Sequence, residues 1–236
     1  MRIMFVGDSM TVGHTGDFTW RYRMWQHLQA TFDGGYRIVG PRHTLHDTLQ
    51  DTPTSHEYGD PGFPGPARRH LAGWGEGWLH MAPLIGDAVR RHNADTLLVS
   101  LGLIDLGFYT NADQTAENVR HFVTEARAAA PHIRAVLMPV IPNVRAVTDT
   151  AFGEQCARFN ELLAKAVADL STPASPLLLA SEPAGWEIDR ATYDGTHPSA
   201  SGEHLLAGAF ADAMHQAWGA GGPYVAREDL AATALS

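Results

Sequence analysis

Three residue types that together perform nucleophilic acyl transfer lie near the two ends of this sequence. Ser9 follows Gly7 and Asp8 directly, after the short apolar run 2–6, and Asp194 and His197 lie three positions apart near the other end. A serine hydroxyl becomes a good nucleophile when a histidine removes its proton, and a carboxylate orients that histidine. We therefore expect Ser9 to be the nucleophile, His197 the general base and Asp194 the orienting acid.

The run from Asp194 to Pro198 has the composition of a tight turn. Gly195 permits the turn, and Pro198 restricts the backbone where the turn ends. Such a turn can direct the Asp194 and His197 side chains into one cleft. Each motif alone also has a purely structural interpretation, with Ser9 as a helix N-cap and Asp194 in an ordinary turn. Their joint presence favours the catalytic interpretation.

The elements that must position these residues alternate between strands and helices. Continuous apolar runs, typical of strands buried on both faces, predict a mostly parallel sheet. We expect an α/β fold: a three-layer α/β/α sandwich around a central five-stranded sheet. The predicted strands are 3–6, 36–39, 96–101, 135–141 and 177–179, and the predicted helices are 19–31, 79–92, 112–130, 152–170 and 200–218. Pro131 should close the third helix, and Pro198 should lie at the start of the last.

Length and composition indicate one globular domain. The 236 residues carry 44% hydrophobic residues and a net charge of −9, which argues against nucleic-acid binding. We predict a single domain over 1–218, a long loop or lid at 41–77 and a tail at 219–236. No apolar run is long enough to span a membrane, and the first predicted strand leaves no room for a signal peptide, so a cytoplasmic location is expected.

The two end motifs resemble those of the GDSL esterase/lipase family, also called SGNH hydrolases. The matching residues are Gly7, Asp8 and Ser9 at one end and Asp194 and His197 at the other. The chain lacks the G-x-S-x-G motif of the α/β-hydrolases, which share the order serine, acid, histidine. The resemblance implies a flavodoxin-like SGNH fold and hydrolysis of an ester.

The resemblance also implies an oxyanion hole with three hydrogen-bond donors. These are the Ser9 N–H, a glycine N–H from the run 73–78, where Gly77 is the first choice and Gly75 the reserve, and an asparagine side chain. The third block here reads Gly-Leu-Ile-Asp, and Ile104 stands where the family has asparagine. The loss of one such donor costs on the order of a hundred- to a thousand-fold in turnover.

Three explanations for Ile104 remain open. Asn111 or Asn143 can supply the donor, the substrate can be an activated acyl donor, or the pocket can have become a binding site. We expect a serine esterase that acts on a small ester, such as an acetylated or acylated sugar or natural product, without metal or organic cofactor. The alternative is an acyltransferase that passes the same acyl group to an alcohol or amine.

Several other residues have less specific interpretations. The histidines and aspartates of the long loop fit no zinc signature, and we expect a solvated polar loop. Asp8 and Asp105 should orient loops by accepting backbone hydrogen bonds, and the single cysteine, Cys156, should be a buried helix residue. The loop residues are His43, His46, Asp47, Asp51 and His56, and the aromatic residues, several of which flank the predicted site in sequence, are Trp20, Tyr22, Trp25, Trp74, Trp78 and Trp186. Aromatic residues near a cleft can stack on sugars or line an acyl pocket, but at least half of these are expected to pack in the core.

Overall fold

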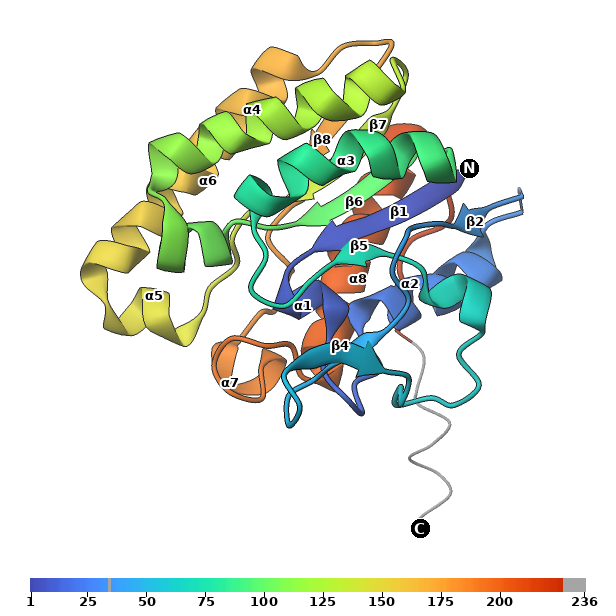
Figure 1. The fold of residues 1–236 in the computed structure, drawn as a ribbon, viewed down its shortest axis with the longest axis horizontal. Coiled ribbons are helices and arrows are strands. Elements are labelled where there is room, and N and C mark those ends of the chain that lie inside the picture. The colour runs from blue at the N-terminus through green and yellow to red at the C-terminus, as the bar shows by residue number, and fades with distance from the viewer. Residues whose placement is uncertain (34, 227–236) are drawn as a thin grey trace.

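The computed structural model describes residues 1–33 and 35–226, and its central element is a parallel β-sheet (Figure 1). The strand order is β2-β1-β6-β7-β8, and a short sixth strand, β5, pairs with the carboxyl end of β1. All of these pairings are parallel, as predicted. The bounds are β1 Arg2–Gly7, β2 Arg37–Ile38, β5 Leu71–Ala72, β6 Thr96–Ser100, β7 Arg134–Met138 and β8 Leu177–Leu179.

The register brings the carboxyl ends of the three central strands to one edge. Gly7 of β1 pairs with Ser100 of β6, which pairs with Met138 of β7. The chain therefore leaves all three strands at neighbouring points. In open α/β sheets, ligands bind outside this edge.

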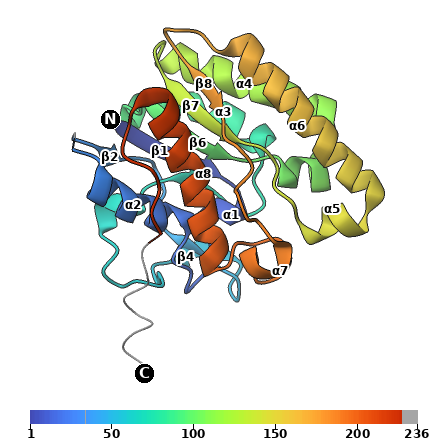
Figure 2. The same ribbon diagram turned by 180° about the vertical axis from the view of Figure 1, so that it is seen from behind.

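Helices cover both faces of the sheet (Figures 1 and 2). One layer contains α3 (Trp78–His92), α4 (Ala112–Ala129) and α6 (Thr150–Leu170), and the other contains α2 (Trp20–Thr31) and α8 (Ala200–Trp218). This confirms the predicted α/β/α sandwich, and α8 has the bounds predicted for it.

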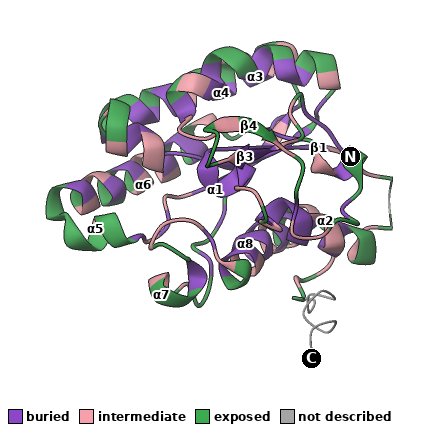
Figure 3. Cartoon of the chain, turned by 60° about the horizontal axis from the view of Figure 1, so that its bottom comes forward, coloured by how far each residue is buried: buried purple, intermediate pink, exposed green. Residues whose placement is uncertain are grey.

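The two faces of β1 supply two separate hydrophobic clusters. Met4 and Val6 pack with α3, α4 and α6, whereas Ile3 and Phe5 pack with α2 and α8. All four side chains are fully buried. Figure 3 shows the buried residues concentrated in the sheet and on the helix faces turned toward it. A strand buried on both sides explains the continuous apolar run in the sequence.

The segment 41–77, predicted as a long loop, contains short regular elements. An antiparallel pair is formed by β3 (Leu45–Asp47) and β4 (Thr52–Ser55), and the 3₁₀ turn η1 (Gly65–Arg68) precedes β5. These elements are two to four residues long. Elements this short cannot be recognised from hydrophobic periodicity in the sequence.

Other short helices were also missed in the sequence. They are α1 (Ser9–Val12), the π-helical turn η2 (Asp105–Tyr109), α5 (Val144–Thr148) and α7 (Ile188–Ala191). Pro198 does not lie at the start of the last helix as predicted, because the helix begins two residues later at Ala200. Ser199 is the N-cap of α8, and its hydroxyl accepts a hydrogen bond from the Gly202 N–H, so Pro198 precedes the cap.

The predicted tail is only partly covered, because residues 227–236 lie outside the described residues. Its first part packs on α8: the Tyr224 N–H donates to Asp212, and the Tyr224 ring packs against the cluster under α2 and α8. The described residues of the predicted tail therefore lie against α8.

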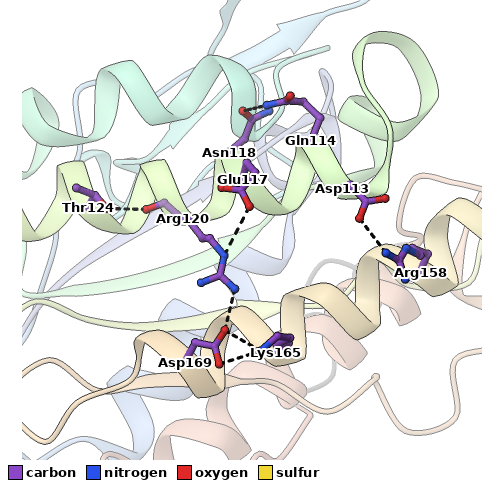
Figure 4. A network of polar contacts seen from close by, with 9 residues as sticks. All are labelled: Asp113, Gln114, Glu117, Asn118, Arg120, Thr124, Arg158, Lys165 and Asp169. Carbon is purple, nitrogen blue, oxygen red and sulfur yellow. Dashed lines mark hydrogen bonds and ion pairs between the residues drawn. The ribbon is translucent and has the colours of Figure 1, made fainter.

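Polar contacts on the surface join α4 to α6 (Figure 4). Arg120 and Arg158 pair with Asp169 and Asp113, each at 2.9 Å, and Lys165 also contacts Asp169. Exposed pairs of this kind contribute little to stability.

None of the helices within residues 1–33 and 35–226 combines the length and apolar character needed to cross a bilayer.

Candidate active site

Ser9 lies where β1 ends and α1 begins. Its predecessor, Asp8, caps α1 by accepting the Met10 N–H at 3.0 Å, and Ser9 itself is buried. A Cβ at Gly7 would lie 2.0 Å from the Thr11 hydroxyl oxygen, so only glycine fits there. The Ser9 N–H donates no hydrogen bond within the described part of the chain. A helix N-terminus with a free N–H is suited to stabilise negative charge.

The turn after α7 brings Asp194 and His197 to Ser9. His197 Nδ1 lies 2.7 Å from Asp194 Oδ2, and His197 Nε2 lies 2.9 Å from Ser9 Oγ. Asp194 Oδ1 also accepts the backbone N–H groups of Thr196 and His197. Gly195 has a φ of +88°, which favours glycine. The three residues predicted from the end motifs thus form one continuous hydrogen-bonded chain.

The environment of Asp194 keeps its carboxyl ionised. Partial burial opposes ionisation, but the hydrogen bonds from His197 and Thr196 outweigh it and lower the pKa of the carboxyl below its usual value. An ionised Asp194 holds the proton of His197 on Nδ1. His197 Nε2 is then free to accept the proton of Ser9.

Aromatic rings enclose the imidazole of His197. The Trp74 ring stacks on one side at 4.9 Å between centroids and 13° between planes, and Tyr193 stacks at 5.7 Å and 15°. His46 stacks on Trp74 at 4.7 Å, and its Nε2 lies 3.1 Å from Asp51. Two residues of the 41–77 segment thereby support the imidazole.

The two glycines considered as oxyanion donors differ in availability. The Gly77 N–H donates to His80 Nδ1 at 3.0 Å, and a Cβ on Gly77 would lie 2.2 Å from Asp105. Gly75 lines the same cavity as Ser9, and its N–H has no partner among the described residues. The geometry therefore favours the reserve choice, Gly75, over Gly77.

Ile104 lines the cavity that contains Ser9, and of the two asparagines considered as substitutes only Asn143 lines it too. Asn143 follows β7 and is buried. Its Oδ1 accepts the Ala146 N–H at 3.0 Å, and its Nδ2 donates to the Ile141 carbonyl at 3.1 Å. A primary amide carries two N–H groups, so one remains for a ligand. Asn111 is exposed and caps α4 away from this cavity.

The cavity at Ser9 has a volume of about 440 Å³ and walls that are mostly apolar. This volume is within the range of about 300–1,000 Å³ typical of small-molecule sites. The sequence did not single out half of its lining residues, and four of these belong to the short elements η2 and α5 and to the start of α6. The lining residues that had not been singled out are Leu103, Phe108, Tyr109, Arg145, Phe152 and Thr196.

Two of these lining residues form part of an exposed aromatic rim. Phe108 is 73% exposed and Tyr109 is 55% exposed. The Arg145 guanidinium lies 4.2 Å from the Phe152 ring centroid and 5.8 Å from that of Phe108, and it donates to the Gly107 carbonyl. Arg145 thus links η2 to α6 at the mouth of the cavity.

The contacts of the remaining candidate residues are those of residues that stabilise the fold. Asp105 accepts the N–H groups of Trp78 and Leu79, so it orients the start of α3 as expected. Cys156 is buried, and burial raises the pKa of its thiol to about 11. His43 and His56 contact each other through their rings. Within the described ranges, no three His, Cys, Asp or Glu residues are grouped in a way that could hold a metal ion.

At the carboxyl edge of a parallel α/β sheet, Asp194, His197 and Ser9 thus lie within hydrogen-bond distance of one another in that order. The model of the GDSL-like lipase/acylhydrolase family matches residues 5–205. The chain belongs to this family, as the two end motifs had indicated, and the protein is a carboxylic-ester hydrolase.

Solved structures share the fold at low sequence identity. A carbohydrate esterase family 3 protein from Talaromyces cellulolyticus is 24% identical with a TM-score of 0.72, and the match covers 92% of this chain and 97% of that one. An acetylxylan esterase from Geobacillus stearothermophilus, solved as a catalytic mutant, is 14% identical with a TM-score of 0.65, and 97% of each chain is covered. A search of curated proteins gave no match.

Proposed function

We propose that the protein hydrolyses a small ester through an acyl-enzyme on Ser9. The observation that carries this proposal is the hydrogen-bonded chain from Asp194 through His197 to Ser9 Oγ. Its order and distances fit a nucleophile, a general base and an orienting acid.

In the first half of the reaction, Ser9 Oγ attacks the ester carbonyl carbon while its proton passes to His197 Nε2. The carbonyl π electrons move to the oxygen, and the tetrahedral intermediate collapses with cleavage of the ester C–O bond. The leaving alcohol takes the proton from His197. In the second half, His197 removes a proton from water, which attacks the acyl-Ser9 carbonyl, and Ser9 Oγ then leaves with that proton.

Three groups of the cavity are available to stabilise the oxyanion. They are the N–H groups of Ser9 and Gly75 and the second amide hydrogen of Asn143. The two backbone donors have no other partner within the described residues, and Asn143 is held by Ala146 and Ile141. We assign to Asn143 the position that the asparagine of the third block has in the family. Ile104 then becomes a wall of the substrate pocket.

The substrate is a small ester, and the cavity favours one with an apolar or ring-shaped part next to the reacting carbonyl. Phe108, Tyr109 and Phe152 offer aromatic faces, which can pack against sugar rings as well as acyl chains. The similar structures include acetyl and acetylxylan esterases. An acetylated sugar and an apolar acyl ester are both compatible with these walls.

Acyl transfer is the second candidate function, and the apolar walls favour it because they disfavour water near the acyl-enzyme. An alcohol bound against Phe108 and Tyr109 would then capture the acyl group. The ratio of transesterified to hydrolysed product, measured with p-nitrophenyl acetate and increasing benzyl alcohol, distinguishes the two. A ratio no higher than in the uncatalysed reaction rules out transfer to this acceptor.

The proposal is tested by steady-state hydrolysis of p-nitrophenyl acetate. Ser9→Ala should reduce kcat by at least about a thousand-fold, because the nucleophile is lost. Ser199→Ala, a serine that caps α8 outside the cavity, is the matched control and should stay within a few-fold of the wild type. Equal turnover in Ser9→Ala and the wild type would refute the assignment of the nucleophile.

A further inference from the structure

A second hollow, of about 860 Å³, lies at the opposite end of β1 from Ser9. It is formed by the first residues of β1 and β2, by the outer side of α2, by the η1 turn and by the last residue of α3. We call it the arginine groove. Its defining residues are Arg2, Arg37, Arg69, His43 and His92, together with the aromatic residues Trp25 and Tyr36.

Three arginines contribute to the lining of the groove. Arg2 and Arg37 are register partners on neighbouring parallel strands, so their side chains leave the same face of the sheet. The Arg2 guanidinium donates to the carbonyls of His92 and Asn93 at the end of α3. Like charges directly opposite each other on a sheet are destabilising.

The other two arginines have guanidinium groups without a partner among the described residues. Arg37 and Arg69 are exposed, and neither forms an ion pair or a side-chain hydrogen bond with the residues that the structure describes. No acidic residue belongs to the described lining of the groove. The Asp95 carboxylate, which accepts the backbone N–H of Arg2, also accepts the Thr96 hydroxyl.

Burial and the neighbouring arginines also affect the pKa values of the two histidines of the groove. Partial burial and the neighbouring Arg69 both lower the pKa of His43, and burial, Arg69 and Arg2 lower the pKa of His92. The whole chain, in contrast, carries 26 acidic against 17 basic residues. A local cationic hollow on an acidic protein attracts anions selectively.

The walls between the charges are flat and apolar. Trp25 and Tyr36 are half-buried, and Pro64, Pro66 and Ala67 of the η1 region line the same hollow. A simple inorganic anion would leave these surfaces uncovered. A ring that carries a charged group would cover them and pair with the arginines.

We propose that the arginine groove binds a ring-bearing organic anion, with a carboxylate or phosphate held by Arg37 and Arg69 and the ring packed on Trp25 and Tyr36. This site is separate from Ser9, and the proposal does not depend on the proposed function. It adds a binding site at the edge of the sheet, next to the β2 strand.

The test is isothermal titration calorimetry with three ligands built on the same sugar ring: glucose 6-phosphate, glucuronate and glucose. At low ionic strength, at least one of the two anions should bind about tenfold or more tightly than glucose, because charge-assisted hydrogen bonds supply the difference. The anion that binds shows whether phosphate or carboxylate is preferred. Equal affinity for glucose, or no binding of either anion, would overturn the proposal.

The double variant Arg37→Ala/Arg69→Ala should weaken binding of the preferred anion by about tenfold or more. Arg158→Ala is the matched control, because Arg158 lies on α6 and pairs with Asp113 (Figure 4). Thermal unfolding of each variant shows that it is folded. Unchanged affinity in the double variant, or an equal loss in Arg158→Ala, would contradict a site at the arginine groove.

Discussion

At the scale of single residues, the proposed oxyanion hole depends on the amide of Asn143. Its Oδ1 caps α5 and one N–H is bonded, so the second N–H is the only part available for catalysis. Asn143→Asp should therefore keep the cap, since aspartate is a good N-cap residue, but lose the donor. We expect kcat for p-nitrophenyl acetate to fall by about 10²–10³-fold with little change in KM.

Asn111→Asp provides the matched control for this substitution. Asn111 caps α4 with the same geometry but lies outside the cavity lining, so its replacement should leave kcat near the wild-type value. Ile104→Asn in the Asn143→Asp background should restore part of the activity. Full activity of Asn143→Asp would show that Asn143 gives no support to the oxyanion.

Some residues of the candidate site could be predicted from the sequence and others could not. Ser9, Asp194 and His197 stand in two short motifs whose order and composition are distinctive. The choice between Gly75 and Gly77 was not available from the sequence, because it depends on the hydrogen bond from the Gly77 N–H back to His80. The sequence offered Asn143 only as one of two possible donors in place of the asparagine missing at Ile104, since no recognisable motif surrounds Asn143.

At the scale of elements, the turn from β1 into α1 contains a buried carboxyl, that of Asp8, next to Ser9. Burial raises the pKa of Asp8 from 3.8 to about 7. The folded protein therefore binds a proton that the unfolded chain has lost. The stability from this group is complete below the unfolded pKa and is lost as the pH rises from about 4 through 7, by roughly 4 kcal/mol in total.

Asp8→Asn removes this ionisation and keeps an oxygen for the Met10 N–H. Urea unfolding at pH 4.5, 5.5, 6.5 and 7.5 should show the variant gaining stability over the wild type as the pH rises. Asp87→Asn is the control: Asp87 is exposed and its hydrogen bond with Arg90 lowers the pKa of its carboxyl, so its difference should stay constant over this range. A constant difference for Asp8→Asn as well would contradict the raised pKa.

The short elements are where the sequence was least informative about architecture. The 41–77 segment reads as a loop because its strands and turn span two to four residues each. Yet this segment supplies Trp74, which stacks on His197, and His46, which stacks on Trp74. The long strands and helices were predictable because their apolar runs are buried on one or both faces, whereas pairing in β3, β4 and β5 depends on tertiary contacts.

At the scale of the whole molecule, the parallel sheet explains how residues nearly two hundred positions apart meet. The chain returns to the carboxyl edge of the sheet after β1, β6, β7 and β8, and Ser9, Ile104, Asn143 and His197 lie on these returns. The alternation of apolar strands and helices was enough to predict this arrangement. The arginine groove was not predictable, because its residues come from five separate segments.

The most direct test of the central claim is covalent labelling with a fluorophosphonate serine probe, followed by tandem mass spectrometry of the digested protein. The probe reacts with a serine whose hydroxyl is activated by a neighbouring base. We predict one probe group per chain, attached to Ser9, with loss of ester hydrolysis in proportion to labelling. Attachment to another serine, or full hydrolysis by a protein labelled at Ser9, would contradict the acyl-enzyme mechanism.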